Sequence, residues 1–557
     1  MRRFLGVTVF ALGVAAAGCS APDAPRSTGS AGPARVTSAP EGLGPHRRTV
    51  TTASAAAQAE FDRGLAYLYG FNHDEAIRAF TRATEADPAC AMAWWGIAYA
   101  HGPHINNPAV PEPRARAAWE ALGKAREHAA HGTEIERALI EALAARYAWP
   151  QPEDRAPLDA AYADAMRAVA ARHPDDADVG ALAAEALMDV HPWDLWLHDG
   201  TAQPWTAEIV ATLERVLAGS PRHPLAAHLY IHAVEASAEP GKADAAADVL
   251  RELMPGIGHM VHMPSHIDVR RGRWREAIVA NTKAMAADHA YQARVPEQQF
   301  YRVYMAHNHH MRAFAAMMLG RSRLALESVR EMVAEMPADW LEQNALAADG
   351  WVAMPLEVLM RFGRWEEILA EPEPPAHLPL TRALRHYARG VAYAAQGRLE
   401  EARAEQAAFE RARPQVAEEA TFGNNPSRDL LGVAEAVLDG EILVRGGRTD
   451  EGLARLREAV AREDALRYDE PPDWIQPVRH ALGAALLAAG RPAEAEQVFR
   501  ADLAKLPGNG WSLFGMARAV RLQGRSEEAE RWEAEFRAAW AEADVKIDSP
   551  CFCQKGV

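Results

Sequence analysis

The chain has 557 residues, of which 49% are apolar and 24% are charged, and its formal net charge at pH 7 is −16. A chain of this length and apolar content can form several domains or one extended array. The negative charge argues against nucleic acid as the main partner, because phosphate binding needs a positive surface. Four cysteines are too few for a fold that depends on a disulfide framework.

Residues 1–19 predict a targeting signal rather than a part of the folded protein. Two arginines precede an apolar stretch of signal-peptide length, which ends in AAGC at residues 16–19. This end resembles the lipobox of bacterial lipoproteins, which implies a lipid on Cys19 and a cell-envelope location, at an outer membrane and facing the periplasm or the surface. An ordinary secretory signal is the alternative. We therefore expect contact with a membrane through the lipid anchor only.

Residues 20–48 are rich in Pro, Gly, Ser and Ala and predict a disordered tether. Beyond the tether, a short pattern recurs. An apolar helical segment is followed by Gly-Arg, or by Phe-Asn in the first instance, and then by a second helical segment rich in acidic residues and Ala. Glycine suits a left-handed residue at the end of the first helix. The instances begin at residues 71, 272, 320, 363, 397, 447, 490 and 524.

Residues 61–88, FDRGLAYLYGFNHDEAIRAFTRATEADP, are similar to the tetratricopeptide repeat consensus, with Ala76 and Phe80 at inward positions. Over residues 55–540 the chain resembles the tetratricopeptide-repeat superfamily. The resemblance implies an all-α, tetratricopeptide-like helical-hairpin solenoid with a concave surface for a protein or peptide partner. The expected divisions are a helical region with a histidine-rich site at 49–350, a C-terminal array at 351–546 and a tail at 547–557.

Histidine is concentrated in residues 228–310. His228 and His232 are four residues apart, as are His262 and His266, and the two pairs are separated by 34 residues, the period of a tetratricopeptide repeat. Residues four apart share one face of a helix. In a solenoid the two pairs would occupy equivalent positions on neighbouring helices, so we expect their imidazoles to converge.

Three further features extend this pattern. Glu235 lies on the same helical face as the first pair, and a third segment carries His307 and His310 on one face, with Tyr304 one turn earlier. Imidazoles with a carboxylate suit copper, iron or zinc equally well. We therefore predict a transition-metal site formed by the six histidines, with Glu235 and Tyr304 as candidate catalytic residues. The alternative is a ladder of structural histidines bonded to carbonyl and carboxylate oxygens.

Two polar segments and one histidine outside these pairs are candidates for ligand contact. The segments are the loop that ends the helical pattern at 94–108 and the stretch MDVHPWDLWLHDG at 188–200. Loops rich in hydrogen-bonding side chains suit ligand contact, although each can equally be a capped turn. The candidate residues are His101, His104, Asn106, His191, Asp194 and His259.

These observations leave three functions open. The first is a metal-dependent enzyme that acts on a small substrate, with the metal activating water or oxygen or polarising a substrate group. The second is a scaffold for a peptide or envelope protein, and the third is metal storage or delivery with Cys551 and Cys553 as a transfer site. The sequence has no Ser-His-Asp arrangement, no phosphate-binding loop and no dinucleotide fingerprint.

Overall fold

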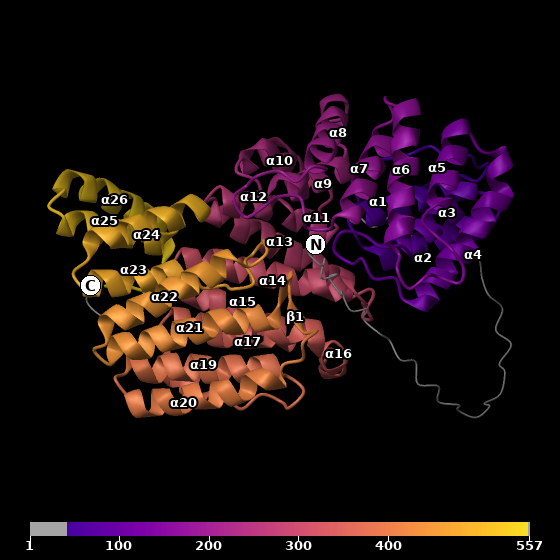
Figure 1. Ribbon diagram of the computed structural model, residues 1–557. Helices are drawn as coiled ribbons and strands as arrows, with labels where there is room; N and C mark the ends of the chain where they lie inside the picture. The colour runs from indigo at the N-terminus through magenta and orange to yellow at the C-terminus, as the bar shows by residue number, and fades with distance from the viewer. Residues whose placement is uncertain (1–41, 555–557) are drawn as a thin grey trace, which may run out of the picture. The chain divides into compact units, whose positions relative to one another are not determined.

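The computed structural model describes residues 42–554, which form helices and one short β-hairpin (Figure 1). The predictions for residues 1–19, including the lipid on Cys19, and for most of the tether lie outside the described residues. The chain divides into two compact units, Met1–Ala165 and Met166–Val557. Within residues 42–554, no helix is both long and apolar enough to cross a membrane.

The first unit begins with a helical hairpin of α1 (Ala55–Tyr69) and α2 (His73–Ala86). The ring of Phe80 packs directly on Gly64 of α1 and Gly96 of α3, where an added Cβ would lie 2.5 and 2.7 Å from the ring. Small residues at these crossings allow the helices to approach closely. The unit continues with α3 (Ala91–Ala100), α4 (Glu112–His128), η1 (Ala129–His131) and α5 (Glu134–Ala144), and α6 (Ala156–Arg172) contains the division.

The second unit begins with helices that carry the histidine-rich segments. These are α7 (Ala177–Val190), α8 (Thr206–Gly219), α9 (Pro224–Val234), η2 (Pro240–Ala243), α10 (Asp244–Leu253), α11 (Gly258–His262), α12 (Pro264–Arg270), α13 (Trp274–Gln292) and α14 (Tyr301–Met318).

Regular helix pairs follow, and Figure 1 shows several of them side by side. They are α15 (Ser322–Ala334), α16 (Ala338–Gln343), α17 (Ala345–Arg361), α18 (Trp365–Ala370), α19 (Pro379–Ala395), α20 (Leu399–Ala412), η3 (Arg413–Gln415), α21 (Ser427–Arg445) and α22 (Thr449–Asp464). The β-hairpin of β1 (Thr421–Phe422) and β2 (Asn425–Pro426) precedes α21. The last are α23 (Val478–Ala488), α24 (Pro492–Lys505), α25 (Gly510–Leu522), α26 (Ser526–Ala539) and η4 (Trp540–Glu542).

The predicted Gly-Arg turns are confirmed. At each of the seven turns the glycine has a positive φ, between 62° and 79°, and joins a helix that ends two residues before it to one that begins two residues after it. In the first hairpin Phe71 takes the left-handed position with φ 55°. The turn residues are Gly272, Gly320, Gly363, Gly397, Gly447, Gly490 and Gly524. The fold is thus the expected all-α helical repeat solenoid.

The second unit also contacts itself over long sequence distances. Trp274 at the start of α13 donates a hydrogen bond from Nε1 to the carbonyl of Pro507 at 2.9 Å. Trp511 of α25 donates to the carbonyl of Met317 at 2.7 Å, and Asp544 accepts from the Ser322 amide at 2.7 Å. One apolar core runs from Val269 to Trp511, and the expected change of repeat regularity near residue 350 falls inside it.

Candidate metal centre

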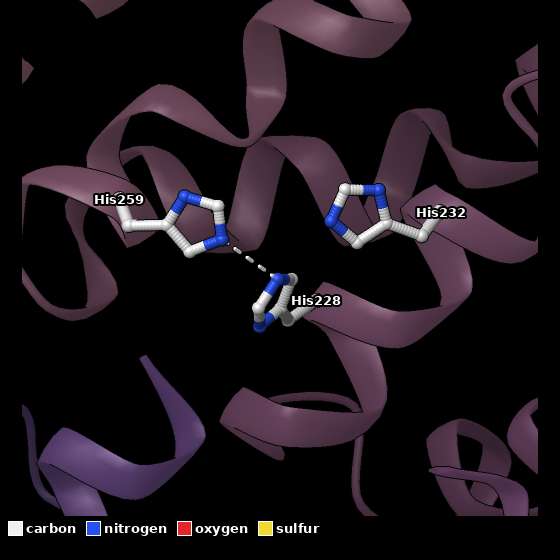
Figure 2. A group of neighbouring side chains, drawn as sticks. All are labelled: His228, His232 and His259. Atoms are coloured by element: carbon white, nitrogen blue, oxygen red, sulfur yellow. Dashed lines mark hydrogen bonds between the residues drawn. The ribbon is translucent and has the colours of Figure 1, made fainter. Parts of the chain in front are cut away.

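The first group of imidazoles is formed by α9 and α11. Pro224 occupies the first turn of α9, and every residue of this helix is buried, so His228 and His232 lie one turn apart inside the protein. His259 reaches them from α11, and its Nε2 is 3.1 Å from the Nε2 of His228. Figure 2 shows the three rings facing a common point. One ligand atom of each histidine lies within 4.8 Å of the other two.

The second group is formed by α11, α12 and α14. His262 ends α11 and Pro264 begins α12. His266 lies in α12, four residues after His262. The Nε2 atoms of His262 and His266 are 2.8 Å apart, and the ring of His307 lies 4.6 Å from His262 and 5.5 Å from His266. One ligand atom of each of these three histidines also lies within 4.8 Å of the other two. His307 is only partly buried, so this group is the more accessible of the two.

Glu235, at the end of α9, links the two groups. Its Oε1 accepts from Nδ1 of His232 at 2.8 Å, and its Oε2 is 2.6 Å from Nδ1 of His266. His262 has an equivalent partner in Asn281 of α13, whose Oδ1 is 2.6 Å from Nδ1. The Asn281 amide nitrogen donates to the carbonyl of Ala277, so its oxygen is the atom that faces the imidazole. Each partner is an acceptor and therefore places the proton on Nδ1.

The consequence is that two nitrogen lone pairs face each other. When Nδ1 carries the proton in both His262 and His266, the neutral rings have none on Nε2, yet these atoms lie 2.8 Å apart. Two acceptors at this distance repel each other unless a cation lies between them. A proton can serve, and so can a metal ion. A positive charge at the second group, from a proton or a metal ion, would relieve this repulsion.

The electrostatics agree with this picture. Burial lowers the pKa of His262 well below its usual value, and the neighbouring His266 lowers it further. Burial also acts to lower the pKa of His266, but the Glu235 carboxylate outweighs it and the pKa is raised. Burial acts to raise the pKa of Glu235, but the two imidazoles outweigh it and lower the pKa to about 2. His259 and His307 are held neutral, because burial lowers the pKa of each well below its usual range.

Two aromatic residues border the histidines. The ring of Tyr304 lies 4.2 Å from that of His259. The ring of Trp193 stands edge-on to His232 at 5.1 Å, and its backbone has φ 59°, a left-handed conformation that is rare for a residue with a side chain. The loop that carries it is fastened to α9, because Trp196 donates from Nε1 to the carbonyl of Ala233 at 2.8 Å.

The structure brings together five of the six predicted metal ligands and separates the sixth. His310 is buried against Phe422, with ring centroids 6.0 Å apart, and belongs to neither group. His259, predicted only as a ligand contact, takes its place in the arrangement. The two HxxxH pairs lie together as expected: His232 and His266 are 5.2 Å apart by ring centroid.

The remaining ligand-contact candidates lie in two separate loops. His101 caps the end of α3, and His104 stacks on His73 at 4.3 Å and pairs with Asn107, next to Asn106. His191 stacks on Trp205 at 3.6 Å. Asp194 accepts from Gln203 at 2.8 Å. These contacts place the residues in ordered turns, and whether any of them binds a ligand stays a prediction.

Sequence reasoning missed Asn281 and the role of His259. Asn281 is a fully buried polar residue in the helix that packs on α11, and the signal was an asparagine at an inward position of α13. His259 lies three residues before His262, a spacing that places both on one helical face. The spacing could therefore have indicated that His259 lies with His262.

Comparisons with known proteins bear on the fold. The tetratricopeptide repeat family matches residues 57–90, and no curated protein matches the chain. Among solved structures, the human IFIT1 dimer with m7Gppp-AAAA is 11% identical, with 88% of this chain and 91% of that chain covered and a TM-score of 0.30. The APC/C hetero-tetramer Cut9-Hcn1 is 13% identical, with 89% and 76% covered and a TM-score of 0.29.

The P58(IPK) tetratricopeptide domain is 13% identical, with 85% of this chain and 100% of that chain covered and a TM-score of 0.18. Likenesses this weak do not bear on function. The family match and the seven further helix–turn–helix units agree with each other. This chain therefore carries a tetratricopeptide repeat at residues 57–90 within an all-α solenoid of helix pairs.

Proposed function

We propose that the protein binds two transition-metal ions and uses them as a metal-dependent enzyme on a small substrate. The observation that carries the proposal is the pair of three-histidine groups joined by one carboxylate. His228, His232 and His259 would hold one ion, and His262, His266 and His307 the other. We call these the first and second triads.

The surroundings of the triads support metal binding over a structural role. In protein metal sites the outer ring nitrogen of a ligating histidine donates to a carboxylate or carbonyl, which fixes the ring and its tautomer. Glu235 and Asn281 make this kind of contact. Among the described residues, Nε2 of the buried His232 has no hydrogen-bond partner, as expected of an atom that binds a metal. Three neutral imidazoles suit copper, iron or zinc.

The number of protein ligands in each triad supports catalysis over storage. A triad supplies three protein ligands, and a catalytic metal site keeps a further position open for water or substrate. The partial exposure of His307 offers an approach to the second triad. A metal there would polarise a substrate group or activate a bound water or oxygen. Glu235 would orient the imidazoles, and Tyr304 would lie beside the first triad.

The remaining parts of the proposal concern location and partners. A lipid on Cys19 would hold the protein at the cell envelope, with the small substrate reaching it there. The second candidate function, a scaffold for a peptide or protein, is favoured by the tetratricopeptide match at residues 57–90. The expectation that nucleic acid is not a partner rests on the net charge of −16 and stays a prediction.

Elemental analysis after loading with Cu(I), Fe(II) or Zn(II) tests the proposal. The wild-type chain should retain about two ions, and His228→Ala and His307→Ala should each retain about one. His310→Ala is the matched control. His310 lies in the same helix as His307 but stacks on Phe422 and belongs to neither triad, so this variant should keep both ions.

A wild-type chain that retains none of the three metals would overturn both the enzyme and the storage functions. If the metal binds, azide added to the Cu(II)- or Co(II)-loaded protein distinguishes them. A change in the visible spectrum shows an exchangeable position, as catalysis requires. An unchanged spectrum would favour storage or delivery.

A further inference from the structure

A cavity lies among the later helix pairs and is lined by none of the triad residues. It encloses about 40 Å³ between α17, α19, α21, the segment before α23 and the C-terminal tail. A water molecule needs about 10–15 Å³ measured in this way, so the cavity has room for a molecule of a few non-hydrogen atoms. The polar and aromatic residues that line it include Arg361, Trp365, Tyr387, Glu441, Trp474 and Gln476.

Several polar atoms of this lining are buried and have no hydrogen-bond partner among the described residues. They include one acceptor, Oε1 of Glu441, and three donors, Nε of Arg361, Nε1 of Trp474 and Nε2 of Gln476. The Glu441, Arg361 and Trp474 side chains are 2%, 4% and 2% exposed. Buried polar groups are almost always paired, so a set of unpaired ones around one cavity indicates a bound group that pairs with them.

The lining holds one basic and one acidic side chain, Arg361 and Glu441, and burial raises the pKa of Glu441 to about 7. Arg361 is held in place because its guanidinium stacks on Trp511 at 3.7 Å and its Nη2 donates to Nδ1 of His480 at 2.8 Å. Glu441 has no cation within ion-pair distance among the described residues. The rings of Tyr387 and Trp474, which both line the cavity, lie 5.6 Å apart, and aromatic rings of this kind can contact a cation.

We propose that this cavity binds a small zwitterion of the α-amino-acid class. Its ammonium group would pair with Glu441, and its carboxylate would accept from Arg361, Trp474 and Gln476. The lining also includes the aliphatic side chains of Val391, Val437 and Val478, which suit a short apolar side chain. This site is independent of the proposed metal chemistry.

The C-terminal tail forms one wall of the cavity. Cys551 and Cys553 are joined by a disulfide and both line the cavity. Phe552 between them packs on Trp511 and approaches Gly363, where an added Cβ would be 2.9 Å from the phenylalanine Cβ. In the disulfide the sulfurs lack the thiolate charge that soft-metal binding requires. The Cys-Phe-Cys segment therefore closes a ligand site here rather than binding metal.

Isothermal titration calorimetry of the full chain with L-alanine tests the proposal. Alanine should bind, and propionate and ethylamine, which each carry one of its two charges, should bind at least 10-fold more weakly. Glu441→Gln should weaken alanine binding at least 10-fold and Trp474→Phe by a smaller factor. Glu435→Gln, on the same helix α21 but paired with Arg462 at the surface, should bind alanine like the wild type.

Three results would overturn the proposal. One is the absence of heat with alanine at millimolar concentration. Another is propionate or ethylamine binding as tightly as alanine, because a site for one charge needs no zwitterion. The third is a Glu435→Gln variant that loses as much affinity as Glu441→Gln. The thermal midpoint of each variant without ligand checks that it is folded, and a Glu441→Gln chain that does not fold leaves Trp474→Phe to decide the matter.

Discussion

Buried histidines occur in two regions of the second unit, and their partners differ. In the C-terminal helices His480 accepts from Arg361 at Nδ1, at 2.8 Å, and pairs with Asp502 through Nε2, at 2.9 Å. Asp502 also accepts from Asn509 and Ser512. In the triads, by contrast, the Nδ1 atoms of His232, His262 and His266 face Glu235 or Asn281. Nε2 atoms face one another in the pairs His228–His259 and His262–His266. Burial alone thus does not mark a metal ligand; the identity of the atoms that face each ring nitrogen does.

The pKa values of two buried carboxyl groups, Glu235 beside the triads and Glu357 in the later helices, are shifted in opposite directions. Glu235 faces two imidazoles, which outweigh the effect of burial and lower its pKa to about 2. Glu357 on α17 is as deeply buried but has no cationic partner, and burial raises its pKa to about 8. Glu235 is therefore charged near pH 7, whereas Glu357 is largely neutral. The difference follows from the neighbours rather than from depth.

The largest effect should come from breaking the fully paired histidine. His480→Ala leaves the Arg361 guanidinium and the Asp502 carboxylate buried without their shared partner, which typically costs about 3–5 kcal/mol. Urea unfolding should show this loss, and elemental analysis should show unchanged metal content. His232→Ala should have the opposite profile, with loss of metal and a smaller change in the stability of the metal-free protein. A metal content that falls in His480→Ala would remove the distinction between the regions.

A pH series should sharpen the contrast between the carboxyl groups. The pKa of Glu357 is raised in the fold, so the native state holds its proton between about pH 4.5 and 8 while the unfolded chain has lost it. Stability from this group is therefore complete below pH 4.5 and is lost as the pH rises to 8. Glu357→Gln, which is neutral at every pH, should gain about 2–4 kcal/mol relative to wild type between pH 5 and pH 9.

The matched control is Glu405→Gln. Burial acts to raise the pKa of Glu405, but His386 and Arg389 outweigh it and lower the pKa. Its contribution therefore has the opposite sign: it is present above the ordinary pKa and is lost toward acid. Urea unfolding at each pH measures both variants. A difference between wild type and Glu357→Gln that stays constant across the series would show that this carboxyl is not protonated in the fold.

The link between the triads should be sensitive to the charge of one residue. Glu235→Gln keeps the size of the side chain but removes the carboxylate that holds Nδ1 of both His232 and His266. Loss of such an outer partner typically weakens metal affinity about 10–100-fold. Competition with a chelator measures the affinity, and both ions should be affected because Glu235 contacts one histidine of each triad. Weakening of one ion alone would show that Glu235 serves a single site.

The sequence predicted the features that depend on neighbouring residues. Seven Gly-Arg turns were recognisable because a left-handed residue must end the first helix, and the HxxxH pairs because one turn of helix brings such residues together. The choice between His259 and His310 was not predictable in this way. His310 shares a helical face with His307, but packing of α14 on other helices turns it toward Phe422. The contact of Asn281 with His262 likewise depends on how α13 packs on α11.

The smallest effect should come from Trp193, which holds a left-handed backbone beside His232. Trp193→Gly relieves about 1–2 kcal/mol of backbone strain but loses the packing of the ring, so the net change in stability should be within about 1 kcal/mol. Without the ring, the first triad is less shielded, and its ion should pass to a chelator faster while the ion of the second triad is unaffected.

Phe71→Gly is the matched control for Trp193→Gly, because Phe71 has the same left-handed conformation, with φ 55° against 59°. It lies in a hairpin of the first unit that carries no triad residue. Equal release rates in the two variants would show that backbone relief, rather than the lost indole, governs the exchange. A change confined to Trp193→Gly would assign the loop at residues 191–205 to the metal centre, because strain beside His232 persists only where the surrounding contacts hold it.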